Sequence, residues 1–224
     1  DLYIKDFETA FSFHKKSLII RDSLNYHKGI CISLRNLGSL EIRRNNYKEA
    51  IDYLNRGLAL ADSINYRTMI ASMNYQLANF YRYTKDLNSA LSAIHKSVDI
   101  HLNAKNVTGQ VWSNLLCGEI YFDLEKYSIA YDYAMKAYNM ANKLGKPEGI
   151  GYTALLLSKC YNELGNHKEA YKYHLIYAQE NEKLADRVDI AKTATHRFQL
   201  KAEREKERLK QARREEQSKF KNRQ

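Results

Sequence analysis

The sequence is poor in the two residues that most often interrupt regular structure, because its 224 residues include one proline and nine glycines. This scarcity favours long helices over a succession of short strands and turns. Long apolar runs are missing as well, and stretches such as Ala-Leu-Leu-Leu at 154–157 are short. Because a membrane-spanning helix needs roughly 20 apolar residues, we expect no membrane span within these residues. The first residues carry no signal-peptide pattern either.

Cysteine is also scarce. Cys31, Cys117 and Cys160 are far apart in the sequence, and no Cys-x-x-Cys pair exists. This spacing argues against a zinc or redox site, so we predict buried thiols that pack as small apolar residues. The motifs of phosphate-binding loops, zinc proteases and serine hydrolases are absent, and the seven histidines are scattered. We therefore expect a protein that is not an enzyme, with no metal and no cofactor.

What the sequence does contain is an internal repeat with a period of forty residues. Alanine recurs in one column without a slip, at Ala10, Ala50, Ala90, Ala130 and Ala170. Large residues stand three positions earlier, at Phe7, Tyr47, Leu87, Tyr127 and His167. A column of small residues holds Gly38, Ala78, Gly118 and Ser158, and an isoleucine column holds Ile30, Ile70, Ile150 and Ile190. The isoleucine column is broken at Gln110.

Each unit divides into two helical segments, because apolar residues follow helical spacing on both sides of a short break. The predicted helix pairs lie at about 69–83 with 87–103, 109–123 with 127–143, and 149–164 with 167–184. Short connections make paired helices antiparallel, and small residues at the crossing let them approach closely. One pair cannot bury both of its apolar faces, so the pairs are expected to stack.

The pattern of small, aromatic and alanine positions resembles the tetratricopeptide repeat. The copy that carries it best contains Cys117, Gly118, Tyr121, Tyr127, Ala130, Ala134 and Ala137. The resemblance covers roughly residues 1–184 and implies an all-α, right-handed superhelical solenoid of antiparallel helix pairs, followed by a long charged C-terminal helix. HEAT repeats also run near forty residues, but they lack this pattern of alanine and tyrosine.

The period of forty exceeds the length of about 34 residues that is usual for this family. We interpret the excess as a longer second helix and exit loop, similar to a variant found in bacterial peptide-responsive regulators and sensor proteins. Two nearly identical stretches, 21–30 and 61–70, fall at this exit. We interpret them as hinges between stacked pairs, with Leu24 and Ile64 as apolar anchors.

The repeat register divides the chain into an array at residues 1–186 and a terminal segment at 187–224. The units lie near 1–26, 27–66, 67–106, 107–146 and 147–186. Phe7 then belongs to a second helix, so residues 1–6 would be the tail of its partner. Because half a unit at the start would expose an unpartnered apolar face, we expect more repeats upstream.

In the family that the sequence resembles, the first helix of each pair lines the concave wall, which implies a groove for a protein or peptide ligand. The candidate groove residues are Arg35, Ser39, Arg43, Tyr75, Asn79, Arg82, Tyr83, Trp112, Glu119, Phe122, Tyr152 and Lys159. Arginine, tyrosine and tryptophan are the types that most often anchor interfaces. Tyrosine at helical spacing also packs between repeats, and this alternative stays open. The family's carboxylate clamp is incomplete here, which disfavours capture of a peptide's C-terminal carboxylate.

The terminal segment is strongly basic. Residues 201–224 hold ten Lys and Arg against five Glu, a surplus of five that is half of the chain's net charge of +10. We predict a capping helix from about Val188 that continues into a charged connector helix. A plain solvated helix is the competing interpretation of this charge pattern. Interspersed glutamates and the absence of aromatic residues over 201–219 make nucleic acid an unlikely partner for the helix.

Two functions fit these features. In bacterial sensors with a similar layout, an array and a charged helix precede a membrane span and an output domain. The resemblance therefore implies the sensing or scaffolding part of a larger bacterial signalling protein, with a juxtamembrane end on the cytoplasmic or periplasmic side. The alternative is a structural assembly module, a homodimer formed through a weak coiled-coil seam in the terminal helix.

Overall fold

The computed structural model describes residues 2–186 together with residues 207, 208 and 210. The labelled helices are α1 (Leu2–Ser23), α2 (His27–Arg43), α3 (Tyr47–Ser63), α4 (Arg67–Tyr83), α5 (Leu87–Asn103), α6 (Val107–Asp123), α7 (Tyr127–Leu144) and α8 (Pro147–Glu163). A further helical stretch follows at residues 167–186. The predicted all-α repeat solenoid is confirmed, and the three predicted helix pairs agree with these bounds to within a few residues. The predicted capping helix and most of the charged connector lie outside the described residues.

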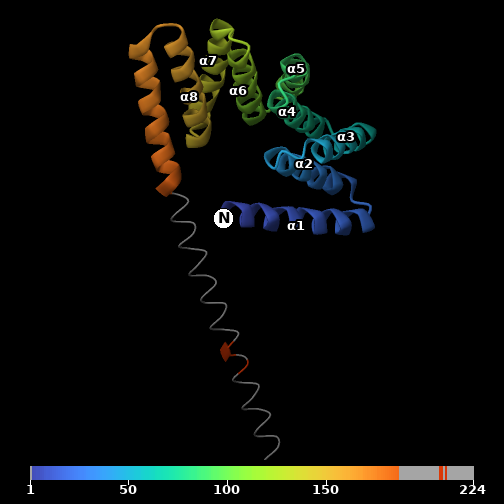
Figure 1. The fold of residues 1–224 in the computed structure, drawn as a ribbon. Helices are drawn as coiled ribbons and strands as arrows, with labels where there is room; N and C mark the ends of the chain where they lie inside the picture. Colours follow the sequence, from blue (N-terminus) through green and yellow to red (C-terminus); the bar gives the residue numbers. More distant parts are fainter. Residues whose placement is uncertain (1, 187–206, 209, 211–224) are drawn as a thin grey trace, which may run out of the picture.

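The helices form a curved stack of two layers (Figure 1). Each labelled helix contacts the next one along the chain. In addition, α2 contacts α4, α4 contacts α6, and α6 contacts α8, whereas α3, α5 and α7 do not contact one another in the described array. The first helices of the pairs therefore form the inner, more closely spaced layer, and the second helices form the outer layer.

A left-handed residue closes each of the eight helices, at intervals of twenty residues. These residues are Asn25, Asn45, Asn65, Lys85, Lys105, Glu125, Gly145 and Gly165, with φ between 51° and 78°. At Asn65, its N–H donates to the carbonyl oxygen of Asp62 at 3.0 Å, and the next N–H, that of Tyr66, donates to Ala61 at 2.8 Å. This pair of bonds satisfies carbonyls that a helix end otherwise leaves without a partner.

The prediction of a long loop after each second helix is wrong. Helices α2 to α6 each contain 17 residues. The turns between them are all three residues long, both inside a pair and between pairs. The two similar stretches are therefore helix caps, whose shared asparagines Asn25 and Asn65 adopt the left-handed conformation. Ile64 packs against the core as expected, but Leu24 is 70% exposed and anchors nothing.

The start of the array also differs from the register. Helix α1 runs without a break from Leu2, whereas the register places a turn just before Phe7. The predicted turn before Phe7 is therefore wrong for this helix.

The core follows the columns of the repeat. Ala50, Ala90 and Ala130 are fully buried, and each lies where the second helix of a pair crosses the first. Opposite Ala130 stands Gly118, where an added Cβ would lie 3.1 Å from the carbonyl oxygen of Ala130. In another pair, Ser158 donates its hydroxyl to the carbonyl oxygen of Ala170 at 2.8 Å. Small residues are thus required because backbone meets backbone at the crossing.

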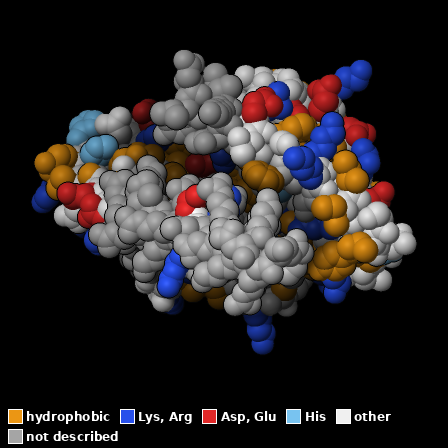
Figure 2. Space-filling model, turned by 90° about the horizontal axis from the view of Figure 1, so that it is seen from below, with side chains coloured by type: hydrophobic (Ala, Val, Ile, Leu, Met, Phe, Trp, Pro, Cys, Tyr) orange, Lys and Arg blue, Asp and Glu red, His pale blue; other side chains and the backbone are white. Residues whose placement is uncertain are grey.

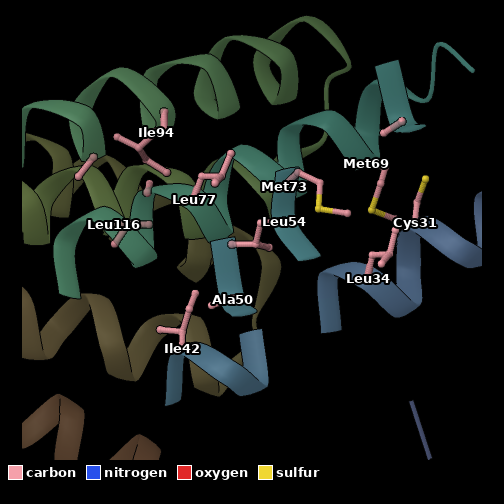
Figure 3. Close-up of a cluster of buried hydrophobic side chains, with 14 of the residues drawn as sticks. Cys31, Leu34, Ile42, Ala50, Leu54, Met69, Met73, Leu77, Ile94 and Leu116 are labelled. Carbon is pink, nitrogen blue, oxygen red and sulfur yellow. The ribbon is translucent and has the colours of Figure 1, made fainter. Parts of the chain in front are cut away.

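Larger apolar side chains fill the space between successive pairs. Figure 3 shows this for Leu34, Leu54, Met73 and Ile94, which come from four different helices. The three cysteines are free and buried, as predicted, and burial raises the pKa of the Cys117 and Cys160 thiols to about 12. These thiols therefore serve as small packing residues.

The crossing geometry predicts the effect of enlarging the alanine column. We expect Ala130→Leu to lower the free energy of unfolding by about 1–3 kcal/mol, because the added atoms have no room against Gly118. Urea unfolding followed by circular dichroism measures the change. Ala59→Leu is the matched control, since Ala59 is exposed on α3 and should change stability by less than about 0.5 kcal/mol. Equal losses in the two variants would contradict the assigned crossing.

The left-handed caps predict opposite effects for one substitution at two places. Lys85 is an exposed cap residue with φ of 65°, a conformation that glycine adopts without strain. We expect Lys85→Gly to stabilise the chain by up to about 1 kcal/mol in urea unfolding. Lys96→Gly, in the exposed interior of α5, should destabilise it by about 1 kcal/mol. A loss of stability at both positions would contradict the left-handed cap.

Candidate functional site: the inner face of the array

The candidate groove residues belong to the first helices, α2, α4, α6 and α8, which form the inner layer. Helical spacing repeats the same inward positions on each helix. Arg35 of α2 and Tyr75 of α4 are equivalent positions one unit apart, and so are Trp112 of α6 and Tyr152 of α8. Neighbouring units thus place different side chains at corresponding points along one surface.

Three of the candidates, Arg35, Tyr75 and Trp112, line one pocket of about 490 Å³. The pocket spans α2, α4 and α6, and its size is typical of sites that bind small molecules or inserted side chains. Ser72 and Gln76 also line it, although the sequence did not single them out. No aspartate or glutamate is among the described residues that line the pocket.

The Arg35 guanidinium is held by neutral groups. Its Nη1 donates to Ser72 Oγ at 3.1 Å, and its Nε and Nη2 donate to Asn36 Oδ1 at 3.2 and 2.9 Å. Burial lowers the pKa of Arg35 from its usual value. The hydrogen bond to Ser72 joins α2 to α4 and fixes the direction of the side chain at the pocket.

His101 enters the same pocket from the last turn of α5, a second helix. The Oδ1 of Asn106 accepts the Gly109 N–H at 3.0 Å, so its amide nitrogen is the donor that lies 3.2 Å from His101 Nδ1. Burial lowers the pKa of His101 and so favours the neutral ring. With Nδ1 accepting, the ring proton is on Nε2, which has no bonded partner among the described residues.

The sequence-based selection considered only the first helix of each pair. It therefore missed His101, which comes from a second helix in the outer layer. One signal was available in the sequence. Gln110 breaks the isoleucine column, and its side-chain amide donates to the carbonyl oxygen of His101 at 3.3 Å. The His101 ring also packs against Gly109, where a side chain would collide with it. The break in the isoleucine column therefore marks the place where Gln110 and Gly109 contact the buried His101.

Arg82 and Glu119, two further candidates, bind each other rather than facing an open site. Arg82 Nη1 donates to Glu119 Oε2, and Arg82 Nε donates to Asp123 Oδ2 at 2.6 Å. Burial alone would lower the pKa of Arg82, but hydrogen bonding to Asp123 and the charges of both acids raise it. These bonds join α4 to α6 across the inner layer, so Arg82 is already neutralised within the chain.

The other candidates surround these two features. Asn79 donates to the carbonyl oxygen of Tyr75 at 3.1 Å, and Phe122 packs on Tyr127 with ring centroids 5.1 Å apart. Tyr152 is exposed, with its ring centroid 6.0 Å from that of Trp112. Of the remaining four, Ser39 is half-buried, and Arg43, Tyr83 and Lys159 are exposed.

Some aromatic residues pack between helices and others line the pocket. Tyr121 stacks on Tyr133, and Tyr161 stacks on Tyr173, which shows packing between helices. Tyr75 is half-buried against the core, and it also lines the pocket. Trp112 lines both the main pocket and a smaller hollow of about 70 Å³ beside Val111 and Leu144.

The described surface carries no uniform charge on the side shown in Figure 2, where acidic, basic and hydrophobic side chains are mixed. No helix in the described part of the chain has the length and apolar character needed to cross a bilayer. Within the same residues, no three histidine, cysteine, aspartate or glutamate side chains converge as a metal site would require.

Solved structures share this fold at low sequence identity. A putative kinesin light chain from Podosopora anserina with nearly identical TPR-like repeats is 13% identical, with 81% of this chain and 90% of that chain covered and a TM-score of 0.60. The apo form of RapI is 14% identical, with coverages of 83% and 80% and a TM-score of 0.60. Aspartyl phosphate phosphatase F from Bacillus subtilis is 18% identical, with coverages of 75% and 45% and a TM-score of 0.59.

No curated protein sequence matches this chain significantly. A family model does match: that of the tetratricopeptide repeat, over residues 2–63. The matched segment contains α1, α2 and α3, and the same helix pair recurs through the rest of the described array. The family model thus supports the predicted tetratricopeptide repeat over residues 2–63, and the solved structures share the fold of the described array.

Proposed function

We propose that the inner face of α2, α4, α6 and α8 binds a protein or peptide ligand without catalysing a reaction. The observation that carries the proposal is the pocket of about 490 Å³, which collects Arg35, Tyr75 and Trp112 from three successive repeats. These are residue types that anchor interfaces through flat contact area and directed hydrogen bonds. A pocket with both apolar and hydrogen-bonding walls suits a peptide side chain.

The array would act as the sensing or scaffolding part of a larger bacterial signalling protein. The pocket touches α2 and α6, two helices that do not contact each other in the described array. A ligand seated there would therefore bridge repeats that are otherwise linked only through α4. Because each repeat contacts only near neighbours, such a bridge would change the pitch of the stack and pass the change toward the terminal segment.

The groove assignment predicts which substitutions abolish binding. The probe is a random 12-residue peptide library displayed on phage and selected on the full chain. Trp112 is the chain's one tryptophan and lines the pocket. A change in its fluorescence therefore reports the binding of a selected peptide. We expect Tyr75→Ala to weaken binding of the selected peptides by about tenfold or more, as for a central interface residue.

Tyr171→Ala is the matched control, because Tyr171 is exposed on the outer stretch at 167–186. It should leave the affinity unchanged. Trp112→Ala, measured by isothermal calorimetry, should weaken binding as Tyr75→Ala does. Thermal melts of the variants separate loss of binding from loss of folding. Unchanged affinity in both folded inner-face variants would overturn the groove assignment.

The assembly alternative places dimerisation in residues 187–224, most of which lie outside the described residues, and it is distinguished by solution mass. For a groove receptor we expect a monomer of about 26.2 kDa by light scattering. A form that ends at residue 199 should also be monomeric. A dimer formed by the full chain and lost in the shorter form would favour the assembly module.

A further inference from the structure

Arg82 and Arg35, two partly buried arginines of the inner face, differ in the charge of their hydrogen-bond partners. Arg82 is bonded to the carboxylates of Glu119 and Asp123. Arg35 is bonded to a hydroxyl and an amide oxygen, and no carboxylate pairs with it among the described residues. A guanidinium has five N–H donors, and the contacts with Ser72 and Asn36 use three of them. Arg35 therefore keeps both its charge and two donors for another acceptor.

The charge around Arg35 is positive on the side of α1 as well. Arg21 of α1 donates to the carbonyl oxygen of Gly29 at 3.0 Å and to Ser33 Oγ at 2.8 Å, so it too is held by neutral oxygens. His14 is close to both arginines: burial lowers its pKa first, and the charges of Arg21 and Arg35 lower it further. An anion near Arg35 would thus meet a favourable potential rather than a repulsive one.

The rest of the pocket lining supplies donors and apolar contact. His101 lines the pocket and keeps an unbonded Nε2–H donor, because its Nδ1 accepts from Asn106. Ser72 and Gln76 add a hydroxyl and an amide, and Trp112 adds an apolar face. A lining that is rich in donors, contains one unpaired cation and lacks carboxylates is complementary to a carboxylate beside an apolar group.

We propose that this pocket binds an acidic side chain of the peptide ligand, with the carboxylate bonded to Arg35 and the neighbouring peptide atoms packed on Trp112. The proposal rests on the proposed function, because it names the ligand chemistry of the same groove. It concerns an internal aspartate or glutamate rather than a peptide's C-terminal carboxylate. The pocket volume of about 490 Å³ leaves room for the acidic side chain together with an adjacent residue.

The test uses the peptides selected from the displayed 12-residue library, synthesised with an acetylated N-terminus and an amidated C-terminus. We expect a shared aspartate or glutamate among them. Replacing that residue with its amide should raise Kd about tenfold or more for the unmodified chain, as for one charged hydrogen-bonded pair. Arg35→Gln should raise Kd similarly for the acidic peptide and by less than about twofold for the amide peptide.

Two further variants keep the test independent of folding effects. Gln76→Glu keeps the shape of the side chain while placing a carboxylate in the pocket, and it should also weaken the acidic peptide about tenfold. Arg56→Gln removes the same charge from an exposed position on α3, in the outer layer, and should change Kd by less than about twofold.

The outcomes separate the two proposals. Selected peptides without an acidic residue, or equal affinity of the acidic and amide peptides, would overturn the acidic-side-chain pocket. If Tyr75→Ala still weakened those peptides, the groove itself would stand. A selection that enriched no peptide on the unmodified chain over the Tyr75→Ala variant would overturn both. An Arg35→Gln variant with unchanged affinity for the acidic peptide would also overturn the pocket.

Discussion

The left-handed cap that ends a helix every twenty residues is the constraint on which the rest of the array depends. It makes the turn inside a pair and the turn between pairs the same length, so helix crossings recur at fixed positions. Each residue advances a helix by about 1.5 Å, and one extra residue would also rotate its apolar face by about 100°. The alanine and small-residue columns can meet, as Ala130 meets Gly118, only because this spacing does not drift.

Regular spacing also explains why the inner face can vary chemically without disturbing the fold. The buried columns hold the stack together, while equivalent inward positions carry Arg35 and Tyr75 in two successive units. Adjacent inner helices are close enough for side chains to bond across them, as Arg35 does to Ser72. A pocket that spans three units can therefore combine a cation, aromatic rings and amides that no single repeat supplies.

Much of the fold was predictable from the sequence because packing at the crossings leaves few choices of residue. The caps were harder to predict, since Asn and Gly signal a left-handed residue but Lys85, Lys105 and Glu125 rarely adopt it. The inward positions were predictable from helical spacing. Their bonding partners were not: the ion pair of Arg82 with Glu119, and the entry of His101, depend on how closely successive pairs approach, which no single repeat encodes.

Arg82 and Arg35 illustrate two different roles for an inner-face arginine. Arg82 holds the array together, and Arg35 is the one that we propose binds a ligand. Arg82 is bonded to the carboxylates of Glu119 and Asp123, so its charge is compensated and its bonds fix α4 against α6. Arg35 is partly buried with neutral partners alone, and burial lowers its pKa, which means that the free chain bears an uncompensated desolvation cost there. An incoming carboxylate would relieve that cost. Because only an anionic group would offset that cost, acidic ligands would be favoured over neutral ones of the same shape.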